Sequence, residues 1–379
     1  MMNKLRVWKR IAFVSVLLAT FGISLNAQTY TVLSNLSSTT GYDIYYASLV
    51  QGSDGNFYGS TYAGGANGMG SVFKITSTGT LTVLHSFATS DGYQPYGGLI
   101  QASDGNFYGT TSSGGTNGLG TIFKISSAGT LTVLHSFATA DGYQNYGGLV
   151  QGSDGNFYGT TYSGGSNGDG TVFRVTSTGT LTVLHSFATS DGYHSYSKLV
   201  QGTDGNFYGT AYAGGANSNG TVFKITSTGT LTVLHSFATS DGYQAYAGLV
   251  QASDGNFYGT TYAGGANSDG TVFKITSAGT LTVLHSFATS DGYHSYSRLV
   301  QGTDGNLYGT AFAGGANSDG TVFKVTTAGT LTVVHSFAVS DGYQPYGGVV
   351  QGTDKNFYGT TCSGGSNSEG TIFKLALGL

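Results

Sequence analysis

The sequence predicts an all-β fold, a seven-bladed β-propeller with four-stranded antiparallel blades, its ring closed by the N-terminal strand pairing with the last blade. Three observations predict it: a fifty-residue repeat, four strand signals in each repeat, and chain ends that complement each other. Periods of 20–50 residues are typical of solenoids, propellers and arrays. Each repeat opens on Q-[GA]-[ST]-D-[GK]-N-[FL]-Y-G, beginning at Gln51, Gln101, Gln151, Gln201, Gln251, Gln301 and Gln351.

Within one repeat, short β-rich runs alternate with turn signals. The runs cover residues 98–101, 107–112, 121–125 and 130–137. Between them lie Ser-Asp-Gly-Asn, a Gly/Asn-rich loop and Ser-Ala-Gly, which are turn sequences. Four short strands joined by tight turns form one antiparallel sheet, as in a propeller blade.

The chain ends favour a ring over a linear β-solenoid. Residues 30–33 match residues 81–84 of a fourth strand, whereas the last repeat ends on its third strand at 371–375. In a solenoid both ends would be unpaired edges, which proteins normally cap. We therefore expect one propeller domain over residues 28–379. Residues 41–49 are one longer than residues 92–99, which predicts a longer loop after the closing strand.

Residues 1–27 have the pattern of a signal peptide. Lys4, Arg6, Lys9 and Arg10 precede an apolar run from 11 to 25, and Ala27 is a plausible cleavage point. An uncleaved anchor is the alternative. Later runs fall short of the ~18 apolar residues of a membrane span, so we expect a secreted, extracellular or periplasmic protein with no transmembrane segment after cleavage.

Composition excludes several classes of protein. Charged residues make up 8% of the 379, against ~25% in ordinary domains, and the 64 Gly occur without the three-residue period of collagen. Removing the signal leaves 10 basic and 18 acidic residues, which argues against a nucleic-acid partner. The lone Cys362 rules out a disulfide framework. We expect a monomer without cofactors.

One face of the propeller is predicted to carry the longer loops. The loops between the second and third strands share it with the crossovers between blades, and functional sites usually lie on such loops. Six crossovers carry a Tyr pair. We expect one Tyr of each pair to pack between blades and the other to be available for stacking on sugar rings. The candidate ligand-binding tyrosines are Tyr96, Tyr146, Tyr196, Tyr246, Tyr296 and Tyr346.

Two crossovers differ from the rest, which suggests polar pockets. They contain His194 with Lys198, and His294 with Arg298, and these four residues complete the candidate ligand-binding set. Drift at positions indifferent to packing is the simpler explanation of the variation.

Other repeated polar residues are expected to be structural. The six strand histidines, from His85 to His335, should pack between blades, and the Asp of each Asp-Gly-Asn turn should cap its own turn. No metal site and no catalytic residue is predicted. A hydrolase or lyase would need converging carboxylates, for which Asp169, Asp269, Asp319 and Glu369 are the candidates.

The unit Q-G-S-D-G-N-F-Y-G-T-T…G-G…N-x-x-G-T-V-F-K, followed by L-T-V-L-H-S-F, resembles the GloVer-type (choice-of-anchor) tandem-repeat family of exported bacterial proteins. The resemblance covers residues 30–379 and implies export and a repeat architecture. Members often carry a C-terminal sorting segment, whereas this chain stops at Leu379, directly after a strand.

Near-identical blades suit multivalent binding better than catalysis, which needs an asymmetric set of groups. We therefore expect a secreted, non-catalytic binding module for carbohydrate or another cell-surface polymer, acting through the Tyr-rich loop face. A structural or adhesive surface protein making protein contacts is the alternative, and a polysaccharide-acting enzyme is a third.

Overall fold

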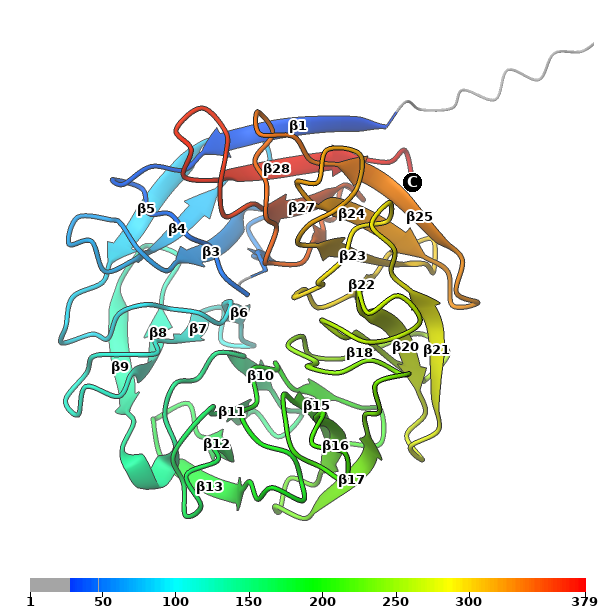
Figure 1. The fold of residues 1–379 in the computed structure, drawn as a ribbon. Helices are drawn as coiled ribbons and strands as arrows, with labels where there is room; N and C mark the ends of the chain where they lie inside the picture. Colours follow the sequence, from blue (N-terminus) through cyan, green and yellow to red (C-terminus); the bar gives the residue numbers. More distant parts are fainter. Residues whose placement is uncertain (1–27, 47) are drawn as a thin grey trace, which may run out of the picture.

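A computed structural model describes residues 28–46 and 48–379. The predicted signal peptide, residues 1–27, lies outside the described residues. The predicted fold is confirmed: the described chain forms seven four-stranded antiparallel sheets arranged radially around a central axis (Figure 1). Nowhere in 28–46 or 48–379 does a helix reach the length and apolarity needed to cross a membrane.

Each blade runs from a short strand at the axis to a longer strand at the rim. The first blade contains β2 (Val50–Gln51), β3 (Phe57–Thr61), β4 (Ser71–Ile75) and β5 (Leu81–Ser86). The second contains β6 (Ile100–Gln101), β7 (Phe107–Thr110), β8 (Thr121–Ile125) and β9 (Leu131–Ser136), followed by the 3-10 turn η1 (Thr139–Asp141). The third contains β10 (Leu149–Gln151), β11 (Phe157–Thr160), β12 (Thr171–Val175) and β13 (Leu181–Ser186). The fourth contains β14 (Val200–Gln201), β15 (Phe207–Ala211), β16 (Thr221–Ile225) and β17 (Leu231–Ser236). The fifth contains β18 (Val250–Gln251), β19 (Phe257–Thr260), β20 (Thr271–Ile275) and β21 (Leu281–Ser286). The sixth contains β22 (Val300–Gln301), β23 (Leu307–Ala311), β24 (Thr321–Val325) and β25 (Leu331–Ser336).

The seventh blade joins the two ends of the chain. It contains β26 (Val350–Gln351), β27 (Phe357–Thr360), β28 (Thr371–Ala376) and, as its outer strand, β1 (Thr29–Asn35). β1 pairs antiparallel with β28, from Thr29 opposite Ala376 to Asn35 opposite Thr371. In Figure 1 the two strands lie side by side at the rim. The ring therefore closes through strand pairing, as the chain ends predicted.

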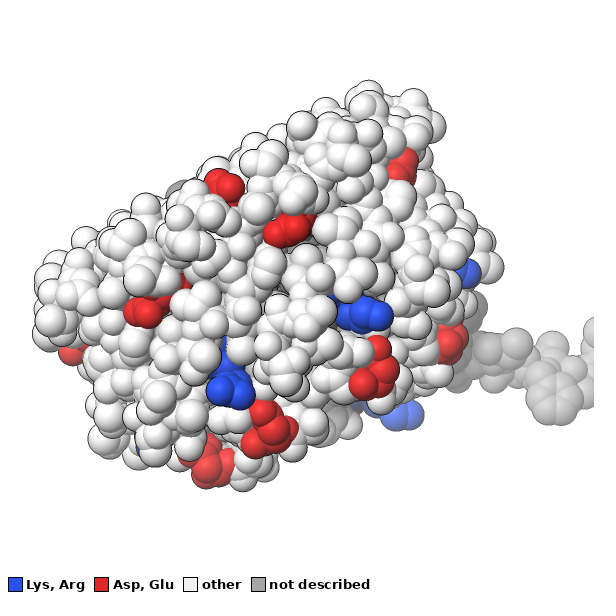
Figure 2. Space-filling model, turned by 90° about the horizontal axis from the view of Figure 1, so that it is seen from below, with Lys and Arg blue, Asp and Glu red and all other residues white. Residues whose placement is uncertain are grey.

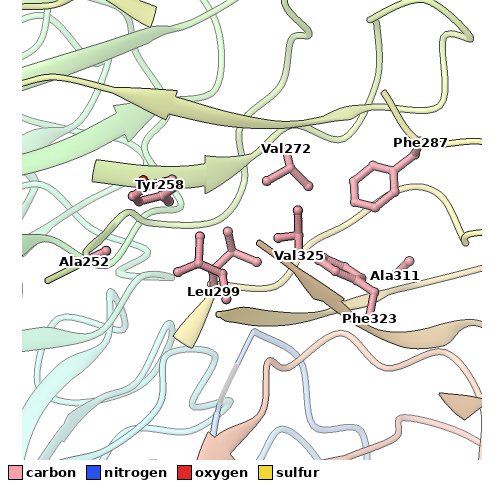
Figure 3. Packing of buried hydrophobic residues seen from close by; sticks show 9 residues of the cluster. Ala252, Tyr258, Val272, Phe287, Leu299, Ala311, Phe323 and Val325 are labelled. Carbon is pink, nitrogen blue, oxygen red and sulfur yellow. The ribbon is translucent and has the colours of Figure 1, made fainter. Parts of the chain in front are cut away.

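The hydrophobic core lies between neighbouring blades. The second and third strands of each blade are largely buried because a blade covers each of their faces. Figure 3 shows one such layer, where Tyr258 and Val272 of the fifth blade meet Leu299 and Val325 of the sixth. The layer repeats around the ring, so each blade depends on both neighbours for burial of its apolar surface.

The Phe-Tyr-Gly motif of the second strand explains how the blades interlock. The buried Tyr58 ring stacks on Phe107 of the next blade, with ring centroids 3.9 Å apart. Gly59 leaves room for a third ring, since a Cβ there would lie 2.5 Å from Phe73. Stacks of this kind, with centroids 3.9–4.1 Å apart, join six of the seven blade pairs, and Leu307 replaces the Phe at the other.

The Asp-Gly-Asn turns cap themselves, as expected. Asp54 accepts hydrogen bonds from the Asn56 backbone at 3.1 Å and from the buried Tyr58 hydroxyl at 2.8 Å. The seven equivalent carboxylates make the same bonds. Burial of the carboxyl works against ionisation, but the bonds from Asn56 and Tyr58 prevail and lower the pKa of Asp54.

The repeated Gln residues form a belt of hydrogen bonds around the channel. The Gln101 Oε1 accepts from the Ser53 backbone of the preceding blade at 2.8 Å, and its Nε2 donates to Gly105 of its own blade. Seven such links, 2.8–3.0 Å long, run from blade to blade and include the junction between Gln51 and Thr353. These amides satisfy blade backbones.

At the rim, each strand histidine pairs with a carboxylate of the following crossover. Six pairs, from His85–Asp91 to His335–Asp341, have N–O distances of 2.6–3.2 Å. The Asp91 carbonyl also accepts from Thr121 of the next blade at 2.6 Å, so the crossover is fixed on both sides.

On the side drawn in Figure 2, charged groups are sparse and basic groups do not gather into a patch.

Candidate binding site on the crossover face

The six candidate tyrosines converge on the propeller axis. Neighbouring ring centroids lie 4.7–5.3 Å apart, and Tyr45 completes a closed ring of seven. The seven rings, which we call the tyrosine ring, are Tyr45, Tyr96, Tyr146, Tyr196, Tyr246, Tyr296 and Tyr346. All are half-buried. Burial raises the pKa of Tyr146 to about 12, so its phenol stays neutral at physiological pH.

Tyr46 lies at the centre of this ring. Its centroid is 5.8 Å from those of Tyr96, Tyr196 and Tyr296, and 6.1 Å from those of Tyr246 and Tyr346. One aromatic side chain thus contacts tyrosines from five different crossovers at the axis.

Sequence reasoning missed Tyr45 and Tyr46, although a signal was present. When residues 41–49 are aligned with residues 92–99, Tyr45 matches Tyr96 and Tyr46 is the inserted residue. The insertion was predicted to lengthen a loop. The inserted residue also supplies the side chain that occupies the axis.

The first Tyr of each pair has a different role from the second. The Tyr93 backbone pairs with Ser113 of the next blade, and its ring packs beside Gly114 and against the core cluster containing Phe123. Its equivalents in the other crossovers pair in the same way. The first Tyr of each pair therefore packs against a blade, whereas the second lies in the tyrosine ring at the axis, a position that the sequence did not predict.

His194 and His294 lie outside the tyrosine ring. The His194 imidazole stacks on Tyr162 at 4.1 Å, and the His294 imidazole stacks on Tyr262 at 4.0 Å. Burial lowers the pKa of both, against the opposing effect of the neighbouring Asp169 and Asp269. In a third crossover Gln244 instead donates to the Tyr212 hydroxyl at 2.7 Å. These positions therefore place polar groups over a second, outer set of aromatic rings.

Lys198 and Arg298 lie below the tyrosine ring, in the channel. Both line a cavity of about 390 Å³ together with Tyr46, apolar residues of the innermost strands such as Val300, and Gln101 of the hydrogen-bonded belt. Burial lowers the pKa of Lys198 to about 7, and the charge of Arg298 contributes. The cavity thus combines apolar side chains and phenols with two basic side chains.

Three of the four candidate carboxylate residues brace neighbouring crossovers through their backbones. The backbone carbonyls of Asp169, Asp269 and Asp319 each accept a hydrogen bond from the next crossover. No group of three His, Cys, Asp or Glu residues in the described chain could hold a metal ion. Cys362 is buried, its Sγ lies 3.4 Å from the Asp43 carboxylate, and burial raises its pKa, which suppresses the reactive thiolate.

The fifty-residue unit matches a known repeat family. The model of the Gloeobacter/Verrucomicrobia repeat matches residues 18–218 and 195–378, which together cover most of the chain. The chain belongs to this family. Membership confirms the predicted resemblance and the tandem-repeat organisation of this Gloeobacter/Verrucomicrobia repeat protein. No curated protein matches it.

Several solved structures share the fold of this repeat protein. Virginiamycin B lyase from Staphylococcus aureus is 16% identical with a TM-score of 0.62, over 92% of this chain and 99% of that one. A structure from Bacteroides uniformis assigned as a 6-phosphogluconolactonase is 18% identical with a TM-score of 0.56, over 80% and 89%. The extracellular domain assigned to a hybrid two-component system of B. thetaiotaomicron is 12% identical with a TM-score of 0.57, over 91% and 39%. At such identities the similarity concerns the propeller fold alone.

Proposed function

We propose that this protein is an exported, monomeric, non-catalytic binding module that recognises carbohydrate, or another cell-surface polymer, through its crossover face. The observation that carries the proposal is the tyrosine ring with Tyr46 at its centre. Eight phenol side chains are gathered at one end of the axis, and each keeps part of its surface exposed. Aromatic faces stack on the apolar faces of sugars, while phenol hydroxyls bond to sugar hydroxyls.

The surroundings of the tyrosine ring suit a neutral polyhydroxylated ligand. Amide and imidazole groups follow the first Tyr in six of the seven crossovers, as in Gln94, Gln144 and His194, and the carboxylate of Asp43 takes this place in the first crossover. Charged groups are few on this chain, so stacking and neutral hydrogen bonds are the interactions that the face offers. Rigid blades hold these groups in place, which reduces the entropy cost of binding.

A polysaccharide-acting enzyme is less well supported. The four candidate carboxylates belong to loops of the third, fifth, sixth and seventh blades, and the backbones of three of them brace the following crossovers. A purely adhesive protein is the second candidate. The cavity beneath the tyrosine ring favours a ligand-binding role over a flat adhesive face.

A glycan array probed with residues 28–379 tests the proposal. We expect binding of at least one glycan, lost or reduced at least tenfold in Tyr196→Ala. The matched control is Tyr193→Ala, which removes a Tyr of the same crossover outside the tyrosine ring. Equal binding by both variants, with the fold retained by circular dichroism, would remove the tyrosine ring as the site. Absence of binding to all glycans would shift the assignment to protein contacts.

A further inference from the structure

The residues that occupy the repeat position of Lys198 and Arg298 in the other blades show why the channel contains a cavity. Lys198 and Arg298 occupy one position of the repeat, just before the innermost strand of the fourth and sixth blades. The other five blades carry small residues there: Ser48, Gly98, Gly148, Gly248 and Gly348. Two long basic side chains therefore enter a space that the other five blades leave open.

Backbone contacts keep two of these positions small. A Cβ at Gly248 would lie 2.1 Å from the carbonyl oxygen of Lys198, and a Cβ at Gly348 would lie 2.5 Å from that of Arg298. A larger residue could enter only if the neighbouring crossover moved. The blades that follow the two basic residues thus cannot fill the cavity with side chains of their own.

The two basic groups lack an acidic partner. None of the cavity-lining residues is Asp or Glu. The Arg298 Nε donates to the Leu249 carbonyl at 2.8 Å, which fixes the guanidinium while its terminal nitrogens make no hydrogen bond within the described chain. The Lys198 amine has no hydrogen bond or ion pair there either. Both side chains are partly buried, and charges withdrawn from water are normally paired, so an unpaired Lys and Arg lining one cavity indicate an anionic ligand.

We propose that the channel cavity binds a small organic carboxylate, held between Lys198 and Arg298 beneath Tyr46. A guanidinium presents two parallel donors to a planar carboxylate, and an ammonium adds a point charge. The surrounding Leu, Val and Tyr side chains would contact the apolar body of the ligand. They suit a carboxylate better than a doubly charged, strongly hydrated phosphate. A sugar acid and an aromatic acid both offer this chemistry.

The site deepens the proposed function and rests on it in part, because Tyr146, Tyr196, Tyr246 and Tyr296 of the tyrosine ring also line the cavity. The tyrosine ring contacts ligand from the crossover face, whereas the cavity extends below it toward Gln101. The other titratable residues that line the cavity with Lys198 are Arg298, Tyr46, Tyr146, Tyr196, Tyr246 and Tyr296. A bound carboxylate would favour the protonated Lys198, so binding should take up protons near pH 7.

Titration calorimetry with D-glucuronate and 4-hydroxybenzoate tests the site, with D-glucose and 4-hydroxybenzyl alcohol as neutral counterparts. We expect at least one acid to bind, its alcohol counterpart to bind at least tenfold more weakly, and affinity for the acid to fall between pH 6 and pH 9. Which acid binds distinguishes a sugar source from an aromatic one. The double variant Lys198→Gly/Arg298→Gly introduces the glycine that four other blades carry at this position. It should weaken binding at least tenfold.

Lys224→Ala, in the third strand of the same blade as Lys198, is the matched control and should bind like the wild type. No binding of either acid at about 10 mM, or equal binding by the double variant, would overturn the site. Binding of neutral glycans to the tyrosine ring should persist in the double variant, so failure of this site and failure of the proposed function give different results.

Discussion

Tyr46 and Tyr296 lie 5.8 Å apart, centroid to centroid, although one belongs to the first crossover and the other to the sixth. Their contact links the axis of the propeller to the sixth crossover. It exists only because the blades return to their starting point and because the first crossover contains one extra residue. The same closure places the Lys198 and Arg298 side chains in one cavity.

Removing the central ring should destabilise the protein. We expect Tyr46→Ala to lower the free energy of unfolding by about 2–4 kcal/mol, since it leaves a cavity where five tyrosines meet. Tyr46→Phe keeps the ring and should stay close to wild type. Urea unfolding followed by fluorescence measures both. An alanine variant as stable as the wild type would show that Tyr46 fills the channel without stabilising it.

The closing strand should contribute through Tyr30. Its ring stacks on His335 at 4.0 Å, and its hydroxyl donates to the Asp341 carbonyl at 3.0 Å. We expect Tyr30→Ala to cost about 2–3 kcal/mol and Tyr30→Phe, which removes only the hydrogen bond, about 1 kcal/mol. Thermal unfolding of the two variants checks the order. Equal losses would assign the contribution to the hydroxyl alone.

The Asp-Gly-Asn turns should make the protein sensitive to acid. The bonds from Asn106 and Tyr108 lower the pKa of Asp104 despite the opposing effect of burial. Its stabilisation is therefore present above the unfolded pKa of ~4 and is lost as the pH falls through the lower folded value. Asp104→Ala should cost about 1 kcal/mol at pH 7, because the buried Tyr108 hydroxyl loses its partner.

The check compares urea midpoints of wild type and Asp104→Ala at pH 7 and at pH 3, where the difference should shrink. Six equivalent turns lose their carboxylates over the same range, so the wild type itself should weaken steeply below pH ~4. An unchanged difference at both pH values would contradict the role given to the charge.

Lys198 should destabilise the unliganded protein in a pH-dependent way. Burial lowers its pKa from 10.5 to about 7, so the folded state carries the cost of a buried charge fully below pH 7. That cost disappears as the pH rises toward 10.5, where the unfolded Lys also becomes neutral. We expect Lys198→Gly to raise the Tm by about 2 °C at pH 6 and by less at pH 9.5. A gain independent of pH would indicate a packing effect.

The repeat made much of the fold predictable. The period of fifty, the Asp-Gly-Asn turns and the match between residues 30–33 and 81–84 are local patterns, and each follows from turn chemistry or strand pairing that holds within one blade. The sequence also predicted that the Phe-Tyr-Gly motif lies in the second strand of each blade. It did not predict that the Tyr ring of this motif stacks on the next blade.

The candidate site was predictable only in part. The tyrosines and the unusual crossovers stood out because repeats can be compared within the chain. The roles of these residues could not be predicted, because residues that differ between repeats can serve packing as well as binding. Ser195 and Ser297, which distinguish the two unusual crossovers, are buried and hydrogen-bonded to the backbone. The histidines were grouped with Lys198 and Arg298, yet they stack on outer rings.

The sequence by itself determined the blade, the number of blades and the strand that closes the ring, because these depend on patterns within fifty residues and on the chain ends. Only the tertiary structure decided that Tyr46 occupies the axis and that Lys198 and Arg298 face one cavity. Side chains from different blades meet at the axis only after closure, and the space left there depends on all seven crossovers together.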